Sequence, residues 1–181
     1  MSCLKARKLT AANKLARVVW QIACWIIFRL TPVPFHAWRA AVLRLFGAKI
    51  GKQVRIYPSA KIWAPWNLVM ANKSCIGPDV DCYCVDRIEL GVRAVVSQRA
   101  YLCTASHDYN RTDLPLTTAP ITLRADAWVA AEVFVGPGVT LNEGAVALAR
   151  SVVVRDVAAW IVVAGNPANP IKQRDRQIKD C

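Results

Sequence analysis

The polar segment from residue 104 to residue 120 contains the residues in this chain best suited to chemistry. It includes His107, one of only two histidines, and Asp108 follows directly. Histidine titrates near neutral pH, so a positioned imidazole can take a proton from a hydroxyl group whose own pKa is far higher. The adjacent carboxylate or a backbone carbonyl would orient that imidazole, and the sequence does not choose between them. Taken alone, the same residues also fit a surface loop without a catalytic role.

The sequence on both sides of this segment follows a six-residue period. Neither an α-helix nor an isolated strand has that period, and short fixed repeats predict a stacked solenoid. Three hexapeptides make one triangular coil of about 18 residues, with an aliphatic side chain pointing inward from each strand. The inward positions, with two phase shifts of two residues and a gap at the polar segment, are Ile50, Ile56, Ile62, Leu68, Ile76, Cys82, Ile88, Leu90, Val96, Leu102, Leu123, Val129, Val135, Leu141, Ala147, Val153 and Ala159. Small or β-branched residues four positions later are expected to fill the corners.

The N-terminal part is strongly basic and rich in tryptophan. The first 78 residues contain 13 Lys and Arg and no acidic residue, within a chain of formal net charge +12. Two largely apolar stretches, 18–28 and 35–46, predict helices separated by the proline-containing residues 31–34. Each is too short to cross a bilayer, which needs about 20 residues. Arginines and tryptophans suit an interfacial helix on anionic lipid, but the same helices also suit a cap over the first coil.

The remaining composition excludes several classes of protein. Seven cysteines, an odd number without a CxxC pair, predict reduced thiols in the cytoplasm. Cys82, Cys84 and His107 lack the fourth ligand of a zinc site, so no metal is expected. Arg29 ends the first apolar stretch without a small-residue cleavage site, which disfavours a signal peptide. No nucleic-acid-binding motif accompanies the basic charge, so no nucleic-acid partner is expected.

Three longer motifs accompany the repeat: Ile-Trp-Ala-Pro-Trp-Asn at 62–67, the stretch around the histidine at 96–109, and Ala-Gly-Asn-Pro-Ala at 164–168. Together they resemble the hexapeptide-repeat acyltransferases, in particular the colanic-acid acetyltransferases related to maltose and galactoside O-acetyltransferases. The resemblance implies an all-β solenoid, a left-handed parallel β-helix over residues 49–172 with an excursion loop at 104–120. An N-terminal helical segment at 1–48 would precede it, and a short C-terminal tail at 173–181 would follow. The 8 glycines are few for this family, in which glycine often follows the inward residue.

The resemblance also implies a function, which is acetyl-CoA-dependent O-acetylation of a sugar hydroxyl in exopolysaccharide biosynthesis. His107 would act as the base in direct transfer, without an acyl-enzyme. A homotrimer would hold acetyl-CoA between neighbouring prisms. Residues at positions that match the family's cofactor site are Trp128, Ala131, Ala149, Arg155 and Lys172. The candidates for binding the acceptor are Tyr83, Cys84 and Asp86, although the family often has asparagine near position 84.

A lipid-linked glycan acceptor would explain the basic N-terminal segment. The enzyme would then be cytoplasmic and peripheral at the inner face of the cytoplasmic membrane. Two alternatives stay open at this point. One is an acetyltransferase that acts on a small soluble acceptor such as a free sugar or serine. The other is a non-catalytic β-helix that serves as a scaffold.

Overall fold

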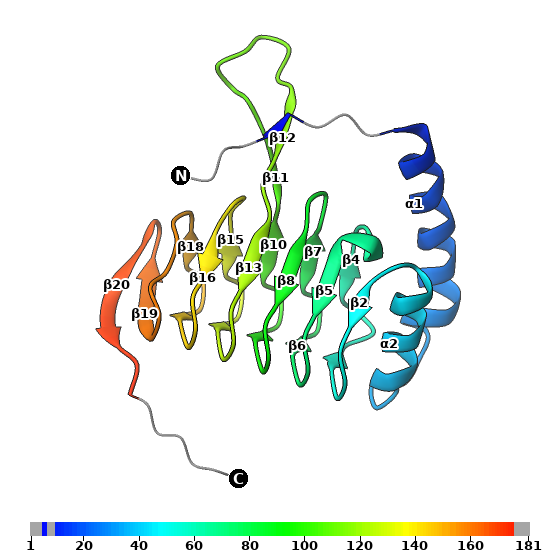
Figure 1. The fold of residues 1–181 in the computed structure, drawn as a ribbon, viewed down its shortest axis with the longest axis horizontal. Coiled ribbons are helices and arrows are strands. Elements are labelled where there is room, and N and C mark those ends of the chain that lie inside the picture. Colours follow the sequence, from blue (N-terminus) through cyan, green and yellow to red (C-terminus); the bar gives the residue numbers. More distant parts are fainter. Residues whose placement is uncertain (1–4, 7–9, 176–181) are drawn as a thin grey trace.

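A computed structural model describes residues 5–6 and 10–175, and most of them form a three-sided β-solenoid (Figure 1). The first side consists of β2 (Lys49–Ile50), β5 (Leu68–Met70), β8 (Ile88–Leu90), β13 (Ile121–Leu123) and β16 (Thr140–Leu141). The second consists of β3 (Arg55–Ile56), β6 (Cys75–Ile76), β9 (Val95–Val96), β14 (Trp128–Val129), β17 (Val146–Ala147), β19 (Ile161–Gly165) and β20 (Ala168–Gln173). The third consists of β4 (Lys61–Ile62), β7 (Asp81–Tyr83), β10 (Tyr101–Cys103), β15 (Phe134–Val135) and β18 (Val152–Val153). We call the turns after these sides the first, second and third corners.

The predicted inward positions form the core of the prism. Ile56, Ile76 and Val96 are in register in successive parallel strands, and all three are fully buried. The small corner residues are buried as well, as Ala94 and Ala127 show. Ala159, however, is exposed, so its predicted inward position is wrong. Val157 pairs with Leu141 in its place, because the last coil is shorter than the repeat predicts.

The phase shifts in the sequence come from longer coils. Ile50, Met70 and Leu90 are register partners 20 residues apart, rather than the expected 18. The two additional residues lie at the third corner, where the first coil forms the short helix η2 (Pro65–Asn67). Both Leu68 and Met70 are buried in β5, so two aliphatic residues of one strand face the core and the period shifts by two.

Charged residues at the corners explain the low glycine count. Within residues 5–6 and 10–175, ten non-glycine residues have positive φ, and nine of them lie at the first and second corners: Gln53, Lys73, Asp79, Arg93, Arg99, Asp126, Glu132, Arg150 and Trp160. This conformation costs an L-residue roughly 1–2 kcal/mol, which glycine would avoid. Several of these side chains pair between coils instead. Arg93 contacts Asp126 at 2.6 Å, and Glu132 contacts Arg99 at 2.9 Å and Arg150 at 2.7 Å.

Three helical elements cover the open end of the first coil (Figure 1): α1 (Ala11–Ala23), η1 (Cys24–Arg29) and α2 (His36–Leu45). Trp20, Phe28 and Leu43 are buried beneath them, and the Trp20 indole donates a hydrogen bond to the Ile62 carbonyl at 2.6 Å. The break between η1 and α2 contains the predicted residues 31–34. Within the described part of the chain, none of the helices combines the length and the apolarity needed to cross a bilayer.

Arg39 joins this helical segment to the solenoid. It is fully buried, and burial lowers the pKa of its guanidinium, which nonetheless stays charged. Its Nε donates to the Ile56 carbonyl at 2.6 Å. The two terminal nitrogens donate to Thr31 Oγ1 at 2.7 Å, to the Pro32 carbonyl at 2.8 Å and to the Val33 carbonyl. One side chain therefore holds both the loop before α2 and the first coil.

The C-terminal end of the prism is closed by an antiparallel strand, whereas the sequence predicted a parallel β-helix up to residue 172. Strand β20 runs antiparallel to β19, with Gly165 and Ala168 paired at the turn. The last parallel strand is therefore β19, and residue 172 lies inside the returning strand. Of the predicted tail at 173–181, residues 176–181 lie outside the described residues.

Candidate active site

A narrow arm leaves the prism at the third corner, where the repeat is interrupted (Figure 1). Strands β11 (Ala105–His107) and β12 (Leu116–Thr118) form an antiparallel hairpin, in which His107 pairs with Leu116. Strand β1 (Lys5–Ala6) pairs with the other edge of β12. The arm therefore projects its turn, residues 108–115, well beyond the body of the prism.

His107 lies at the last position of β11, and its ring is held in one orientation. Its Nδ1 lies 2.6 Å from the Leu114 carbonyl oxygen, and its side chain is exposed. A carbonyl oxygen only accepts, so Nδ1 carries the proton and donates it. In the neutral ring Nε2 then holds the free lone pair. Among the residues that the structure describes, Nε2 has no hydrogen-bond partner, so it is available to accept a proton.

The sequence left open whether Asp108 or a backbone carbonyl orients this imidazole, and in the structure the group beside Nδ1 is the Leu114 carbonyl rather than the Asp108 carboxylate. The Asp108 carboxylate accepts a hydrogen bond from the Asn110 backbone N–H at 3.1 Å, and the Asp108 N–H donates to the Pro115 carbonyl at 3.0 Å. Short polar side chains commonly make such bonds to the backbone two residues on. Asp108 therefore shapes the turn that presents the Leu114 carbonyl to His107.

The foot of the arm is tied to the coil below it. Thr104 Oγ1 donates to the Tyr83 carbonyl at 2.7 Å and accepts from the Asp86 N–H at 2.9 Å. Thr118 Oγ1 donates to Asp86 Oδ2, also at 2.9 Å. Asp86, a candidate for binding the acceptor, thus also fixes where both strands of the arm leave the prism.

The other two acceptor candidates have different surroundings. Tyr83 lies on the outer face of the third side, in a row of aromatic rings between Trp63 and Tyr101, with centroid distances of 5.6 and 6.4 Å. Cys84 is fully buried, and its thiol donates to the Ala64 carbonyl at 3.2 Å. Burial raises the pKa of Cys84 to about 11. The prediction that Cys84 binds the acceptor is therefore wrong, because its side chain points into the prism.

The cofactor candidates fall into two groups. Trp128 lies exposed on the second side, where its indole donates to Ser97 Oγ at 2.9 Å. Ala131 and Ala149 stack at the adjoining second corner, and Lys172 lies in β20 on the same side. Arg155 follows β18 and is exposed at the third corner, the corner that also carries the arm. On a single prism, these five residues therefore lie along two separate edges.

Comparison with known proteins identifies the relatives of this chain. No protein-family model matches it. It is 42% identical over 162 residues to the protein named "Putative colanic acid biosynthesis acetyltransferase WcaF" of Escherichia coli (strain K12), a match that covers 90% of this chain and 89% of the relative. The chain belongs to the hexapeptide-repeat acetyltransferase family.

Two solved acetyltransferase structures have the same fold as this chain. A maltose O-acetyltransferase from Clostridium difficile 630 superposes with a TM-score of 0.82 at 22% identity, and 94% of each chain is covered. A hexapeptide-repeat acetyltransferase from Vibrio cholerae, solved in complex with acetyl coenzyme A, gives a TM-score of 0.81 at 23% identity and covers 92% of this chain and 91% of its own. The β-solenoid predicted from the sequence is therefore confirmed.

The acetyltransferase also contains site features that sequence reasoning missed. The Leu114 carbonyl orients His107, and Thr104 and Thr118 anchor the arm. The interruption of the repeat locates the arm but identifies none of these partners. Within the described ranges, no three His, Cys, Asp or Glu side chains come together as metal ligands.

Proposed function

We propose that this acetyltransferase moves the acetyl group of acetyl-CoA to a sugar hydroxyl during exopolysaccharide assembly, with His107 as the general base. The observation that carries the proposal is the orientation of His107, whose Nδ1 is held by the Leu114 carbonyl while Nε2 has no hydrogen-bond partner among the described residues. The name of the 42% identical relative supports a role in polysaccharide biosynthesis, and that of the maltose O-acetyltransferase supports a sugar acceptor.

The chemistry follows from that free nitrogen. Nε2 takes the proton of the acceptor hydroxyl while its oxygen forms a bond to the thioester carbonyl carbon. The tetrahedral intermediate then breaks the carbon–sulfur bond, and the imidazolium returns its proton to the departing thiolate. The products are the acetyl ester and CoA, and no acyl-enzyme is formed. The Leu114 carbonyl stabilises the ring while it carries the additional proton.

We further propose that two neighbouring copies complete each site, as in the expected homotrimer. Trp128, Ala131 and Ala149 lie at the second side and second corner, whereas His107 projects from the third corner. In a ring of prisms, the arm of one copy would reach the CoA-binding edge of the next. Arg155 would then approach the same groove from the copy that supplies His107, and Lys172 from the copy that supplies Trp128.

The helical segment supports a peripheral membrane location, at the inner face of the cytoplasmic membrane. Buried side chains such as Trp20 face the first coil, whereas the outer face exposes many large apolar side chains: Leu15, Val18, Val19, Ile22, Trp25, Ile26, Leu30, Val33, Phe35, Trp38 and Leu45. Exposed apolar area on this scale marks a contact with a membrane or another protein. Arg29, which lies over the ring of the exposed Trp25, adds charge that suits anionic lipid. Such a location would bring the enzyme to a lipid-linked glycan acceptor.

Release of free CoA from acetyl-CoA tests the proposal, with purified protein and a panel of free hexoses, serine and undecaprenyl-linked sugars. Acceptor-dependent release that disappears in His107→Ala supports the transferase and identifies the acceptor class. Turnover of the soluble acceptors alone would replace the lipid-linked glycan with a small acceptor. If neither CoA release nor CoA binding occurs, the solenoid is a scaffold and the proposal fails.

A further inference from the structure

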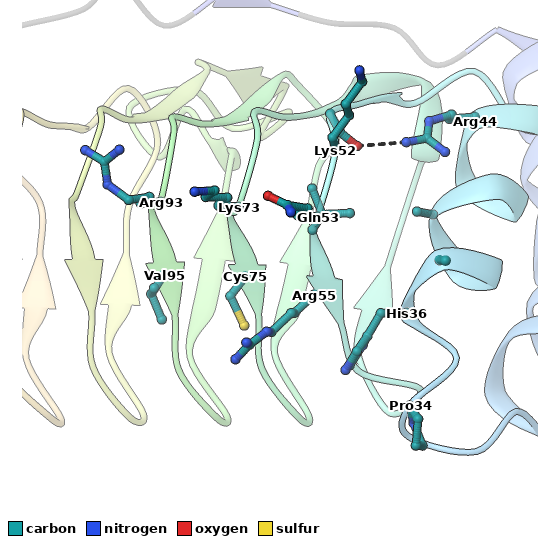
Figure 2. A pocket seen from close by; sticks show the side chains of 14 residues that line it. Pro34, His36, Arg44, Lys52, Gln53, Arg55, Lys73, Cys75, Arg93 and Val95 are labelled. Carbon is teal, nitrogen blue, oxygen red and sulfur yellow. Dashed lines mark hydrogen bonds between the residues drawn. The ribbon is translucent and has the colours of Figure 1, made fainter. Parts of the chain in front are cut away.

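A basic cleft of about 940 Å³ lies between α2 and the first corner of the solenoid (Figure 2). None of the described residues that line it belongs to the arm. Residues from α2 and from the first three coils line it. Its cationic members are Arg44, Lys52, Arg55, Lys73 and Arg93. Of the lining residues that the structure describes, none is acidic. A concave surface lined by one sign of charge concentrates the opposite charge, so this cleft favours an anion.

The cations of the cleft differ in how far they are already neutralised. Arg93 makes a bidentate ion pair with Asp126, with both N–O distances 2.6 Å. Arg44 donates to the Gly51 carbonyl at 2.7 Å and keeps its charge. Lys52, Arg55 and Lys73 are exposed, and none forms an ion pair with a residue that the structure describes. At least three full positive charges therefore remain for a ligand.

The solenoid fixes the spacing of these charges. Lys73 and Arg93 occupy the same left-handed position of the first corner in successive coils, with φ values of 60° and 57°. Successive coils are about 4.8 Å apart, the distance between neighbouring strands. Figure 2 shows Lys73 and Arg93 in one row, with Arg55 lower on the second side. Several Lys and Arg side chains at closely spaced, fixed backbone positions suit a phosphate group, which arginine and lysine bind well.

The cleft opens beside the apolar surface of the helical segment. Pro34 and His36 line the cleft, whereas Phe35 between them and Trp38 one turn later are exposed large apolar side chains. Apolar side chains inserted in the interface of a bilayer would bring the neighbouring cations to the depth of the lipid phosphates. This continuity indicates that the anion is part of a lipid rather than a free ion.

We infer that the cleft binds the phosphate group of a membrane lipid, so that the enzyme docks through both its apolar helical face and a specific headgroup site. The inference rests on the membrane part of the proposed function and is independent of the chemistry at His107. Lys52, Arg55 and Lys73 supply the charge, and Arg44 borders the site from α2.

Vesicle sedimentation of the full chain tests this inference, with phosphatidylcholine alone and with about one lipid in five replaced by phosphatidylglycerol. The cleft variant is Arg55→Gln with Lys73→Gln. The matched control, Lys49→Gln with Lys61→Gln, removes the same charge from exposed positions in the first coil that do not line the cleft. We expect the cleft variant to bind anionic vesicles about thirtyfold more weakly than wild type, and the control within about threefold. The KM for acetyl-CoA should not change in either variant.

Three results would overturn the inference. Equal losses of vesicle binding in the two double variants would assign the binding to the overall positive charge of the basic segment rather than to the cleft. The proposed membrane contact through the apolar helical face would be unaffected. A KM for acetyl-CoA raised about tenfold in the cleft variant alone would assign the cleft to the phosphates of CoA. Calorimetric binding of inorganic pyrophosphate to wild type, together with equal vesicle binding by both variants, would assign it to a soluble phosphate. In each case acceptor-dependent CoA release still reports separately on the proposed reaction.

Discussion

Replacing Arg39 with methionine tests whether the helical segment is a structural cap of the solenoid. The guanidinium is fully buried and donates to the Ile56 carbonyl of the first coil and to three acceptors in the loop before α2. Methionine keeps much of the apolar volume of the side chain but removes all of these donors. The substitution therefore separates hydrogen bonding by Arg39 from simple packing.

The expected loss follows from the fate of each acceptor. The Ile56 carbonyl lies in the fully buried part of the first coil, where its other polar neighbour is His36 Nδ1 at 2.9 Å, and losing the charged donor of Arg39 costs it about 1.5–3 kcal/mol. Pro32 and Val33 are exposed, so water replaces the lost donor and each bond costs about 0.5–1.5 kcal/mol. Removing a buried charge returns part of its desolvation penalty. We expect a net loss of about 3 kcal/mol, a large fraction of the 5–15 kcal/mol typical of a domain.

Urea denaturation followed by circular dichroism measures this loss, with Arg44→Met as the control. Arg44 is exposed and donates to the Ile50 and Gly51 carbonyls at 3.1 and 2.7 Å, so its replacement should cost less than about 1 kcal/mol. A midpoint for Arg39→Met equal to that of the control would refute the reasoning. The cap would then be held by the packing of Trp20, Phe28 and Leu43 alone.

Three further substitutions test the arm and the corners. Asp108→Asn should keep the acetyl-transfer rate within about threefold, because the Leu114 carbonyl orients His107; a hundredfold fall would restore the carboxylate as the orienting group. Thr118→Val removes the hydroxyl that donates to Asp86 and should lower kcat about tenfold without changing the KM for acetyl-CoA, whereas an unchanged kcat would show that the arm is positioned without this bond. The hydrogen bond and charge of Arg150, and then the charge of Arg99, lower the pKa of Glu132 from its ordinary value of 4.5. Its stabilisation is therefore present above that value and lost as the pH falls through the lowered pKa, so urea midpoints of Glu132→Gln and wild type should converge in acid; a constant difference would contradict this assignment.

The sequence predicted the core of the prism well because burial leaves a periodic signal. Every inward aliphatic position demands an apolar residue, and the corner four positions later demands a small one, as Ile56 and Ala60 illustrate. The signal weakened at the ends of the solenoid. Ala159 fits the period, but the last coil is shortened and closed by an antiparallel strand, which involves contacts that the repeat does not encode.

The corners were harder to predict than the sides. A two-residue phase shift does not reveal which corner holds the additional residues, and charged side chains gave no indication of left-handed backbone. Arg99 and Glu132 adopt positive φ at equivalent positions and contact each other only because the coils stack. Inter-coil contacts of this kind join residues far apart in the sequence.

The candidate site was predicted in part. The interruption of the repeat located His107, whereas its partner, the Leu114 carbonyl, is a backbone group that any residue would supply. Alternation along β7, continued to the residue after its end, places Cys82 and Cys84 inward and Tyr83 outward, so the burial of Cys84 was readable from the strand period. The resemblance to the family, which often has asparagine near position 84, instead led to the prediction that Cys84 binds the acceptor.

The most direct test of the central claim is acceptor-dependent release of CoA by wild type, His107→Ala and the neighbouring Asp108→Asn. If His107 is the general base, the alanine variant should lose about 10²–10⁴-fold in kcat while acetyl-CoA binding persists, and Asp108→Asn should stay close to wild type. An alanine variant that turns over the acceptor at nearly the wild-type rate would contradict the proposed role of His107 and the mechanism built on it.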